Sequence, residues 1–132
     1  MAWTSEAGQD GDSWGIFGQR FEASGSAIGQ QFQVNTYTTS YQGYPSVTPL
    51  TGGGFVVTWQ SVNQDGSSGG IFGQRYDASG VVAGGEFQIN THTPGPQVAP
   101  SATSLTDGGF VVTWQSVNQD GDAFGVFGQR YG

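Results

Sequence analysis

The stretch FVVTWQSVNQDG occupies residues Phe55–Gly66 and returns unchanged at residues Phe110–Gly121. A second phrase, IFGQR, starts at Ile16 and again at Ile71, and it returns as VFGQR from Val126. Corresponding positions in these copies lie 55 residues apart. Repetition at a fixed period of this length specifies one supersecondary unit, used several times, that buries its apolar faces on its neighbours. The chain therefore holds about two and a half copies of one unit.

Composition favours an all-β domain. The 132 residues suit a single domain with a core of its own. The 24 glycines and the 14% of aromatic residues favour short strands and tight turns over helices. No stretch shows the apolar stripe of a helix, the long apolar run of a membrane span or the pattern of a signal peptide. We therefore expect strands throughout and no membrane insertion.

The charge and the missing residue types narrow the function. Ten acidic residues stand against three arginines and no lysine, which gives a net charge of -7, so we expect no nucleic-acid partner. The chain has no cysteine, which excludes a disulfide framework and a thiolate metal site. His92 has no recognisable nucleophile or carboxylate pair to work with. The sequence therefore predicts that the chain is not an enzyme and has no catalytic residues.

Within one unit the sequence predicts four short antiparallel strands, at Pro45–Leu50, Phe55–Ser61, Ile71–Tyr76 and Glu86–Asn90. Residues 51–54, which are rich in glycine, form a tight turn between the first two strands. The second and third strands carry apolar groups on both of their alternating faces, which indicates a sheet packed between two neighbouring sheets. That is the environment of a β-propeller blade.

We divide this single repeat domain, residues 1–132, into a partial unit 1–44, a complete unit 45–99 and a partial unit 100–132. The first unit opens at its second strand, and the last closes at its third. A propeller ring needs at least about four blades. We therefore expect the chain to bind copies of itself in a ring or filament through its incomplete units. The alternatives are an excerpted or engineered fragment of a longer array, and a compact trefoil-like or prism-like monomer.

Three phrases carry a resemblance to known repeats. PSVTPLTGG, residues Pro45–Gly53, looks like the first hairpin of propeller blades that bear a P-S-x-x-P-x-x-G signature. DGGFVVTWQS at Asp107–Ser116 and GIFGQRYDASG at Gly70–Gly80 resemble tandem repeats of about 55 residues in large bacterial secreted and surface proteins of adhesin or calcium-binding type. The resemblance implies an extracellular or cell-surface location and a structural or adhesive role.

Aspartates in the loop before the third strand are candidate calcium ligands. An Asp-Gly turn presents a carboxylate beside backbone oxygens, which calcium prefers. Each loop offers only one or two carboxylates, however, and an Asp-Gly pair also forms turns without a metal. A calcium-stabilised spacer and a plain turn therefore both stay open. The candidate residues are Asp10, Asp12, Asp65, Asp120 and Asp122.

The three arginines, Arg20, Arg75 and Arg130, occupy one repeat position. Each follows the aspartate of its Asp-Gly loop by ten residues. Because the planar guanidinium holds a carboxylate with two hydrogen bonds, we expect structural Arg-Asp ion pairs that link loop to strand or unit to unit.

Positions that differ between the units are where a ligand can be selected. Flat aromatic faces beside polar groups suit sugar rings, so a lectin-like, carbohydrate-binding module is the main alternative to self-association. Trp14 has the simpler alternative role of covering the open side of the first unit. The tryptophans that repeat belong to the core instead. The candidate glycan contacts are Trp14, Tyr37, Tyr41, Tyr44 and Phe124.

Overall fold

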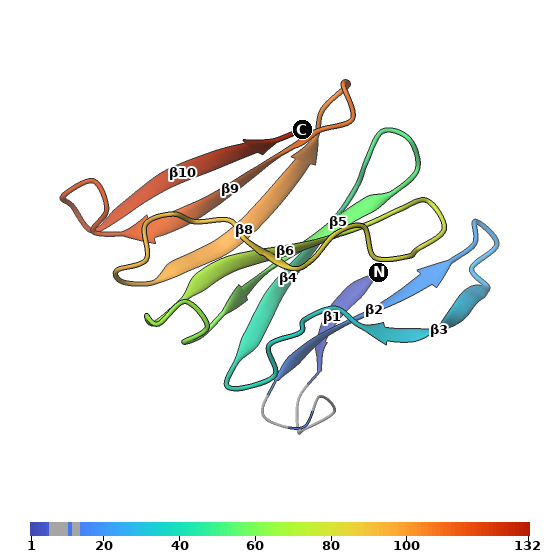
Figure 1. The fold of residues 1–132 in the computed structure, drawn as a ribbon, viewed down its shortest axis with the longest axis horizontal. Helices are drawn as coiled ribbons and strands as arrows, with labels where there is room; N and C mark the ends of the chain where they lie inside the picture. The colour runs from blue at the N-terminus through green and yellow to red at the C-terminus, as the bar shows by residue number, and fades with distance from the viewer. Residues whose placement is uncertain (6–10, 12–13) are drawn as a thin grey trace.

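The structure is a computed structural model that describes residues 1–5, 11 and 14–132. The described residues form ten strands in three antiparallel sheets, which confirms the all-β prediction. The three sheets lie one beside the next in chain order (Figure 1). Within this part of the chain there is no helix, and so none that is long and apolar enough to cross a membrane.

The first sheet contains β1 (Ala2–Ser5), β2 (Gly15–Phe21) and β3 (Ala27–Gln33), in that order across the sheet. β1 pairs with β2 so that Trp3 lies opposite Phe17. β3 covers the other edge of β2, with a shift of register between Gly18 and Arg20.

The second sheet has four strands in sequence order: β4 (Gln42–Pro49), β5 (Phe55–Ser61), β6 (Gly70–Tyr76) and β7 (Phe87–Gln88). The turn between β4 and β5 depends on glycine, because Gly52 and Gly53 have φ angles of 105° and 98°.

β4 begins at Gln42, whereas the sequence predicted a start at Pro45. Its register with β5 shifts between Gly43 and Ser46. Proline is tolerated in a strand at such an irregularity, since no ladder hydrogen bond is lost there. β7 is shorter than the predicted strand Glu86–Asn90, because the Asn90 side chain replaces a backbone group in the hydrogen-bond ladder. Its Oδ1 accepts the hydrogen bond of the Ile71 N–H at 2.7 Å.

The third sheet contains β8 (Gln97–Ser104), β9 (Phe110–Val117) and β10 (Phe124–Tyr131), with β9 in the middle. It repeats the second sheet closely up to its third strand. β8 even keeps the irregularity of β4, with a φ of 54° at Ala99 and at the corresponding Tyr44.

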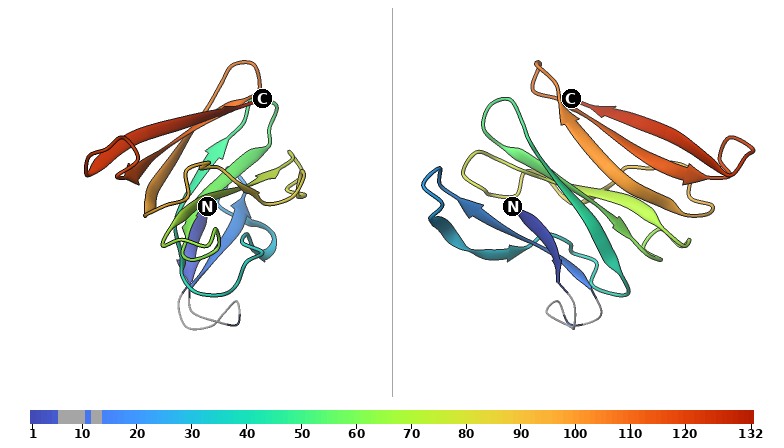
Figure 2. Two further views of the ribbon diagram at one scale, coloured as in Figure 1. Left: turned by 60° about the vertical axis from the view of Figure 1, so that its left-hand side comes forward. Right: turned by 180° about the vertical axis from the view of Figure 1, so that it is seen from behind.

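Each sheet has two chemically different faces. We call the face that carries the position of Ile16, Ile71 and Val126 the aliphatic face, and the face that carries the position of the repeated tryptophans the aromatic face. Because side chains alternate along a strand, a sheet that lies between two others must be apolar on both sides. The two further views, one turned by 60° and one from behind, show the second sheet between the other two (Figure 2).

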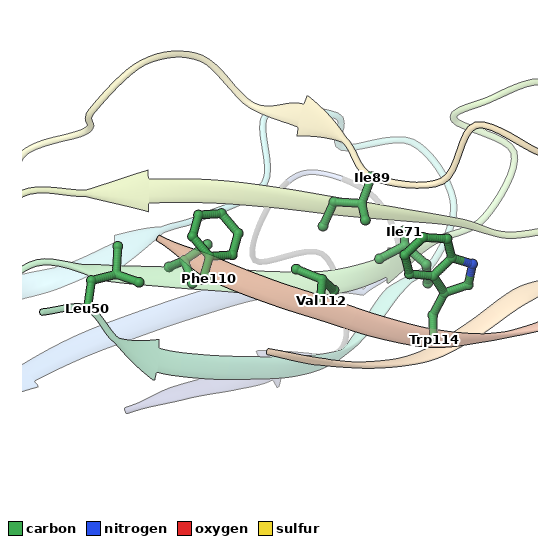
Figure 3. Close-up of a cluster of buried hydrophobic side chains, with 7 residues drawn as sticks. Leu50, Ile71, Ile89, Phe110, Val112 and Trp114 are labelled. Carbon is green, nitrogen blue, oxygen red and sulfur yellow. The ribbon is translucent and has the colours of Figure 1, made fainter. Parts of the chain in front are cut away.

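The core consists of two clusters with the same design. Between the first and second sheets, Ile16 and Val34 on an aliphatic face pack against Trp59 and Phe72 on an aromatic face. Between the second and third sheets, the aliphatic face of the second sheet meets the aromatic face of the third (Figure 3). The residues of this second cluster are Leu50, Val56, Ile71, Ile89, Phe110, Val112 and Trp114.

Candidate functional site

The third sheet turns its aliphatic face outward, where no described residue packs on it as the third sheet packs on the second. Val126 shows this most clearly, since its side chain is 77% exposed. Ile16 and Ile71, at the same repeat position in the other sheets, are 0% exposed. Phe124 on the same strand is also exposed. We call this surface the aliphatic outer face.

The first sheet turns its aromatic face outward. Phe21 is 47% exposed, whereas Tyr76, at the same repeat position in the second sheet, is buried. Tyr76 lies between two rings, with its centroid 4.7 Å from that of Phe55 and 5.4 Å from that of Phe32. Burial, with a smaller contribution from the nearby Glu86 carboxylate, raises the pKa of Tyr76 to about 12. We call this face of the first sheet the aromatic outer face. It is exposed at Phe21, whereas Phe17 on the same strand is buried.

The repeated arginine links each sheet to the next. Arg20 of the first sheet donates from Nη2 to the carbonyl oxygen of Ala78 at 3.0 Å and from Nη1 to that of Ser79. Arg75 of the second sheet donates to the carbonyl oxygen of Gly132 at 2.9 Å. Its guanidinium also lies 5.4 Å from the centroid of Phe110, a cation-π distance.

The turn that receives Arg20 is built to present its carbonyl groups. Asp77 accepts hydrogen bonds from the N–H of Ser79 and of Val81, both at 2.9 Å, and from the Ser79 hydroxyl at 2.6 Å. These bonds, the hydroxyl first, lower the pKa of the Asp77 carboxyl group. Gly80 completes the site, because a Cβ there would lie 2.7 Å from Nη1 of Arg20.

The corresponding turn of the first sheet has the same sequence pattern, but no arginine side chain of the described residues binds its carbonyl groups. Glu22, Ala23, Ser24 and Gly25 stand where Asp77, Ala78, Ser79 and Gly80 stand in the second sheet. Gly25 also has a positive φ, of 89°, but a Cβ built there meets nothing within 4 Å. The first sheet therefore offers an open copy of the arginine acceptor.

Arg130 has no following sheet among the described residues, and it folds back on its own sheet. It pairs with the carboxylate of Asp107, and both side chains are exposed. The N–H of Gly109 and, after it, the charge of Arg130 lower the pKa of the Asp107 carboxyl group. Asp107 stands where the second unit has Gly52, so this ion pair is particular to the last unit.

The expected partners of the arginines are corrected by these contacts. We expected an Arg-Asp ion pair at this repeat position that links loop to strand or unit to unit. Arg130 forms one with Asp107, but Asp65 and Arg75 do not pair. Asp65 instead accepts the N–H of Ser67 at 3.0 Å and the side-chain amides of Gln88 and Asn90. The reason is geometric. Asp65 packs beside Gly70 at the start of β6, and Arg75 lies five residues further on, about 17 Å along an extended strand.

The aspartates form turns in the part of the chain that the structure describes. Asp120 accepts the N–H of Asp122 at 3.3 Å, and Asp122 accepts that of Ala123 at 2.7 Å. Residues 1–5, 11 and 14–132 contain no group of three carboxylate or histidine side chains that could hold a metal ion. Asp10 and Asp12 lie outside the described residues. Calcium binding stays a prediction.

Three of the five candidate glycan contacts come together at one end of the first two sheets. The ring centroid of Tyr41 lies 5.7 Å from that of Trp14 and 6.4 Å from that of Tyr44. Tyr44 is 62% exposed. A Cβ at position 43 would lie 2.1 Å from the Tyr41 hydroxyl oxygen, so a larger residue there would have to displace the Tyr41 ring. Burial first, and then the neighbouring Tyr44, raises the pKa of Tyr41.

The other two glycan candidates lie apart from this aromatic cluster of Trp14, Tyr41 and Tyr44. Tyr37 is half-buried, and its carbonyl oxygen accepts the Asn35 side-chain amide at 2.8 Å. Phe124 belongs to β10 and to the aliphatic outer face. Its repeat position is that of Trp14, but Trp14 lies just before β2, at the first sheet.

Sequence reasoning missed two carboxylates that join parts of the fold. Glu86 accepts the N–H and the hydroxyl of Thr36, at 2.7 and 2.8 Å, and so ties the second sheet to the chain that follows β3. Asp107 holds Arg130. The signal for Asp107 was present, because it replaces a glycine of the preceding unit. Nothing comparable marked Glu86.

Comparison with known proteins gives a likeness of fold. No family model matches the chain, and no curated protein sequence does. A solved structure that resembles it is the endo-arabinase from Bacteroides thetaiotaomicron VPI-5482, with a TM-score of 0.50 and 14% sequence identity. The match covers 86% of this chain and 45% of the arabinase, so the chain spans less than half of that protein.

This neighbour corrects one expectation. The sequence predicted that the chain is not an enzyme, and the finding that its fold resembles that of an endo-arabinase contradicts this prediction. The prediction depended on the absence of a recognisable pair of catalytic side chains in a linear sequence. Such a pair is assembled by the fold from distant positions, so its absence from sequence motifs has little force.

Proposed function

We propose that the chain is a propeller-type repeat module, structural or adhesive and extracellular, that binds copies of itself head to tail. The aliphatic outer face of one copy packs on the aromatic outer face of the next. The observation that carries this proposal is the repeated arginine link. Arg20 and Arg75 each reach the following sheet, while Arg130 and the open turn at Ala23–Gly25 are the two unmatched halves of a third link.

The docking geometry follows from the two interfaces inside the chain. In both of them an aliphatic face meets an aromatic face, with the arginine at the margin. A third interface of this kind, formed between two copies, covers Val126 and Phe21. It moves Arg130 from Asp107 to the carbonyl groups of Ala23 and Ser24. The space beside Gly25 then receives the guanidinium, as the space beside Gly80 receives that of Arg20.

An interface of this kind joins two different surfaces of the same molecule. Such heterologous contacts produce a closed ring if the rotation per copy closes, and a filament if it does not. The likeness to part of a larger endo-arabinase supports consecutive sheets that continue one stacking pattern. The resemblance to tandem repeats of bacterial surface proteins supports the extracellular role.

The test is the mass of the particle in solution by light scattering over a range of concentrations. We expect a mass above the 13.8 kDa of one chain that rises with concentration. Arg130→Ala should shift this rise to higher concentration, because the link between copies is lost. Val81→Lys is the control, since Val81 is exposed in the turn after β6 and belongs to neither outer face. A wild-type protein that stays at 13.8 kDa at every concentration contradicts the proposal.

Carbohydrate binding is a second candidate, supported by the aromatic cluster of Trp14, Tyr41 and Tyr44. Exposed rings at fixed spacing offer stacking surfaces for sugars. The solved neighbour is an endo-arabinase, which adds support from a similar fold. A glycan array tests this candidate. Tyr44→Ala should abolish binding while the particle mass stays unchanged, and an array with no binding to the wild-type protein excludes the candidate under those conditions.

A further inference from the structure

A groove lies between the first and second sheets, beside the edge of β1 that faces away from β2. β1 pairs with β2 along one edge, and no strand of the described residues pairs with its other edge. The surface of the groove is mainly apolar, and Val47 within it is 38% exposed. The residues that carry the argument are Met1, Ala2, Val47, Pro49, Phe55 and Val57.

The same place between the second and third sheets is filled by a strand. There β4 pairs with β5 and packs on the third sheet. The Thr48 hydroxyl donates to the carbonyl oxygen of Ala102 at 3.0 Å, and Leu50 belongs to the cluster around Phe110. The residue after this leucine, Thr51, donates its hydroxyl to the carbonyl oxygen of Leu105 at 3.0 Å.

The groups of the third sheet that contact the β4 segment have counterparts on the second sheet, at the groove. Val47, Leu50 and Phe55 lie one repeat before Ala102, Leu105 and Phe110. Val47 and Phe55 line the groove. The carbonyl groups and the ring that receive β4 on the third sheet are therefore matched on the second sheet by groups that receive no strand from the described residues.

We propose that this groove binds an extended peptide as an additional strand on β1. The peptide is one with the pattern Gln-x-x-Pro-Ser-x-Thr-x-Leu-Thr. Residues 42–51 and 97–106 share this pattern. These two segments contain β4 and β8, the first strands of the second and third sheets. The proposal goes beyond self-association through the outer faces, because the groove lies between two sheets of one chain, although Phe21 of the aromatic outer face borders it.

The register of the added strand follows from that of β4. Ser46 pairs with Thr58 and Val47 with Val57, and the residues of the first sheet that correspond to Thr58 and Val57 are Ala2 and Met1. The serine of the peptide therefore lies opposite Ala2. Strand addition of this kind takes affinity from main-chain hydrogen bonds and specificity from alternate side chains.

Three side chains of the peptide give the specificity. Its threonine donates to the carbonyl group of Val47, and its leucine packs on Phe55, as Thr48 and Leu50 do on the third sheet. Its glutamine accepts from the indole N–H of Trp3, as Gln97 Oε1 accepts from Trp114 Nε1 at 3.1 Å. An uncharged peptide also meets no repulsion from a chain of net charge -7.

The experiment uses the whole chain and a synthetic peptide of residues 97–106, QVAPSATSLT, with a fluorescein label. Anisotropy on titration with the protein should show saturable binding. A scrambled peptide, and a peptide in which the leucine at position 105 is replaced by aspartate, should bind at least about tenfold more weakly, because neither can bury a leucine on Phe55.

Protein variants separate the groove from the outer faces. Val47→Lys places a charge in the groove and should weaken peptide binding at least about tenfold while self-association persists. Val126→Lys should weaken self-association and leave peptide binding unchanged. Because the peptide variants require no change in the protein, a folding defect of Val47→Lys does not affect the test. Absence of saturable binding, or equal binding of the scrambled peptide, overturns the proposal.

Discussion

Three residues at one repeat position allow truncation to alanine to be tested in a buried and in an exposed environment. Ile71 is fully buried between the second and third sheets, and Val126 is 77% exposed on the aliphatic outer face. We predict that Ile71→Ala strongly destabilises the fold, and that Val126→Ala hardly affects the fold but weakens self-association. Ile16, which is also fully buried, gives a second core measurement at the same position.

The magnitudes follow from the buried surface. Ile71→Ala removes three carbon atoms from a site with no exposure, worth about 2.4 kcal/mol of transfer free energy at about 0.8 kcal/mol for each group. The cavity that remains adds to this, so the total loss is about 3 to 4 kcal/mol. Val126→Ala removes two carbon atoms from a site that is mostly in water, which costs about 0.4 kcal/mol in an isolated chain.

Urea denaturation at a low protein concentration, followed by tryptophan fluorescence, measures these losses without a contribution from assembly. Light scattering at high concentration then measures self-association of the same variants. Val81→Ala is the matched control, because Val81 is an exposed valine in the turn after β6 that belongs to neither outer face. The reasoning is refuted if Val126→Ala destabilises the dilute protein as much as Ile71→Ala does, or if it leaves self-association at the level of the control.

Three further predictions concern charge, pH and calcium. Asp107→Asn removes the ion pair that holds Arg130 within its own sheet, so self-association should strengthen up to about fivefold in a light-scattering titration, and an unchanged or weaker association contradicts the proposed role of Arg130. Tyr76, with a pKa raised to about 12 from an unfolded value near 10, stabilises the fold fully below pH 10 and loses this contribution between pH 10 and 12. The stability of Tyr76→Phe, measured by urea denaturation, should therefore fall less over that range than that of the wild-type protein. If the Asp-Gly loops bind calcium, the melting temperature rises with millimolar calcium and falls with chelator. A melting temperature that neither calcium nor chelator changes excludes the calcium site.

The repeat and the alternation of apolar residues were enough to predict the strands of the second sheet. β5 has the predicted bounds Phe55–Ser61, because its β-branched and aromatic residues alternate without interruption between two turns. β7 was predicted too long. The pattern of apolar residues continues to Ile89, but the side chain of Asn90 replaces the backbone in the ladder, which no periodicity reveals.

The partners of the charged residues could not be predicted from spacing. A separation of ten residues suggested Asp65 for Arg75, but β6 carries Arg75 away from the loop and towards Gly132. Contacts between sheets join residues about one repeat apart, as with Arg20 and Ala78. The repeat period itself was therefore the better guide to these partners. The repeat period relates positions in successive sheets. The ten-residue spacing relates only a loop and the far end of the strand that follows it.

The central claim is that two different outer faces bind each other, and a mixing experiment tests it most directly. Val126→Lys blocks the aliphatic outer face, and Phe21→Lys blocks the aromatic one. Each variant alone should stay at the 13.8 kDa of one chain in light scattering. An equimolar mixture retains one intact pair of faces and should reach twice that mass and no more. A mixture that stays monomeric, or a single variant that assembles as the wild-type protein does, contradicts the claim.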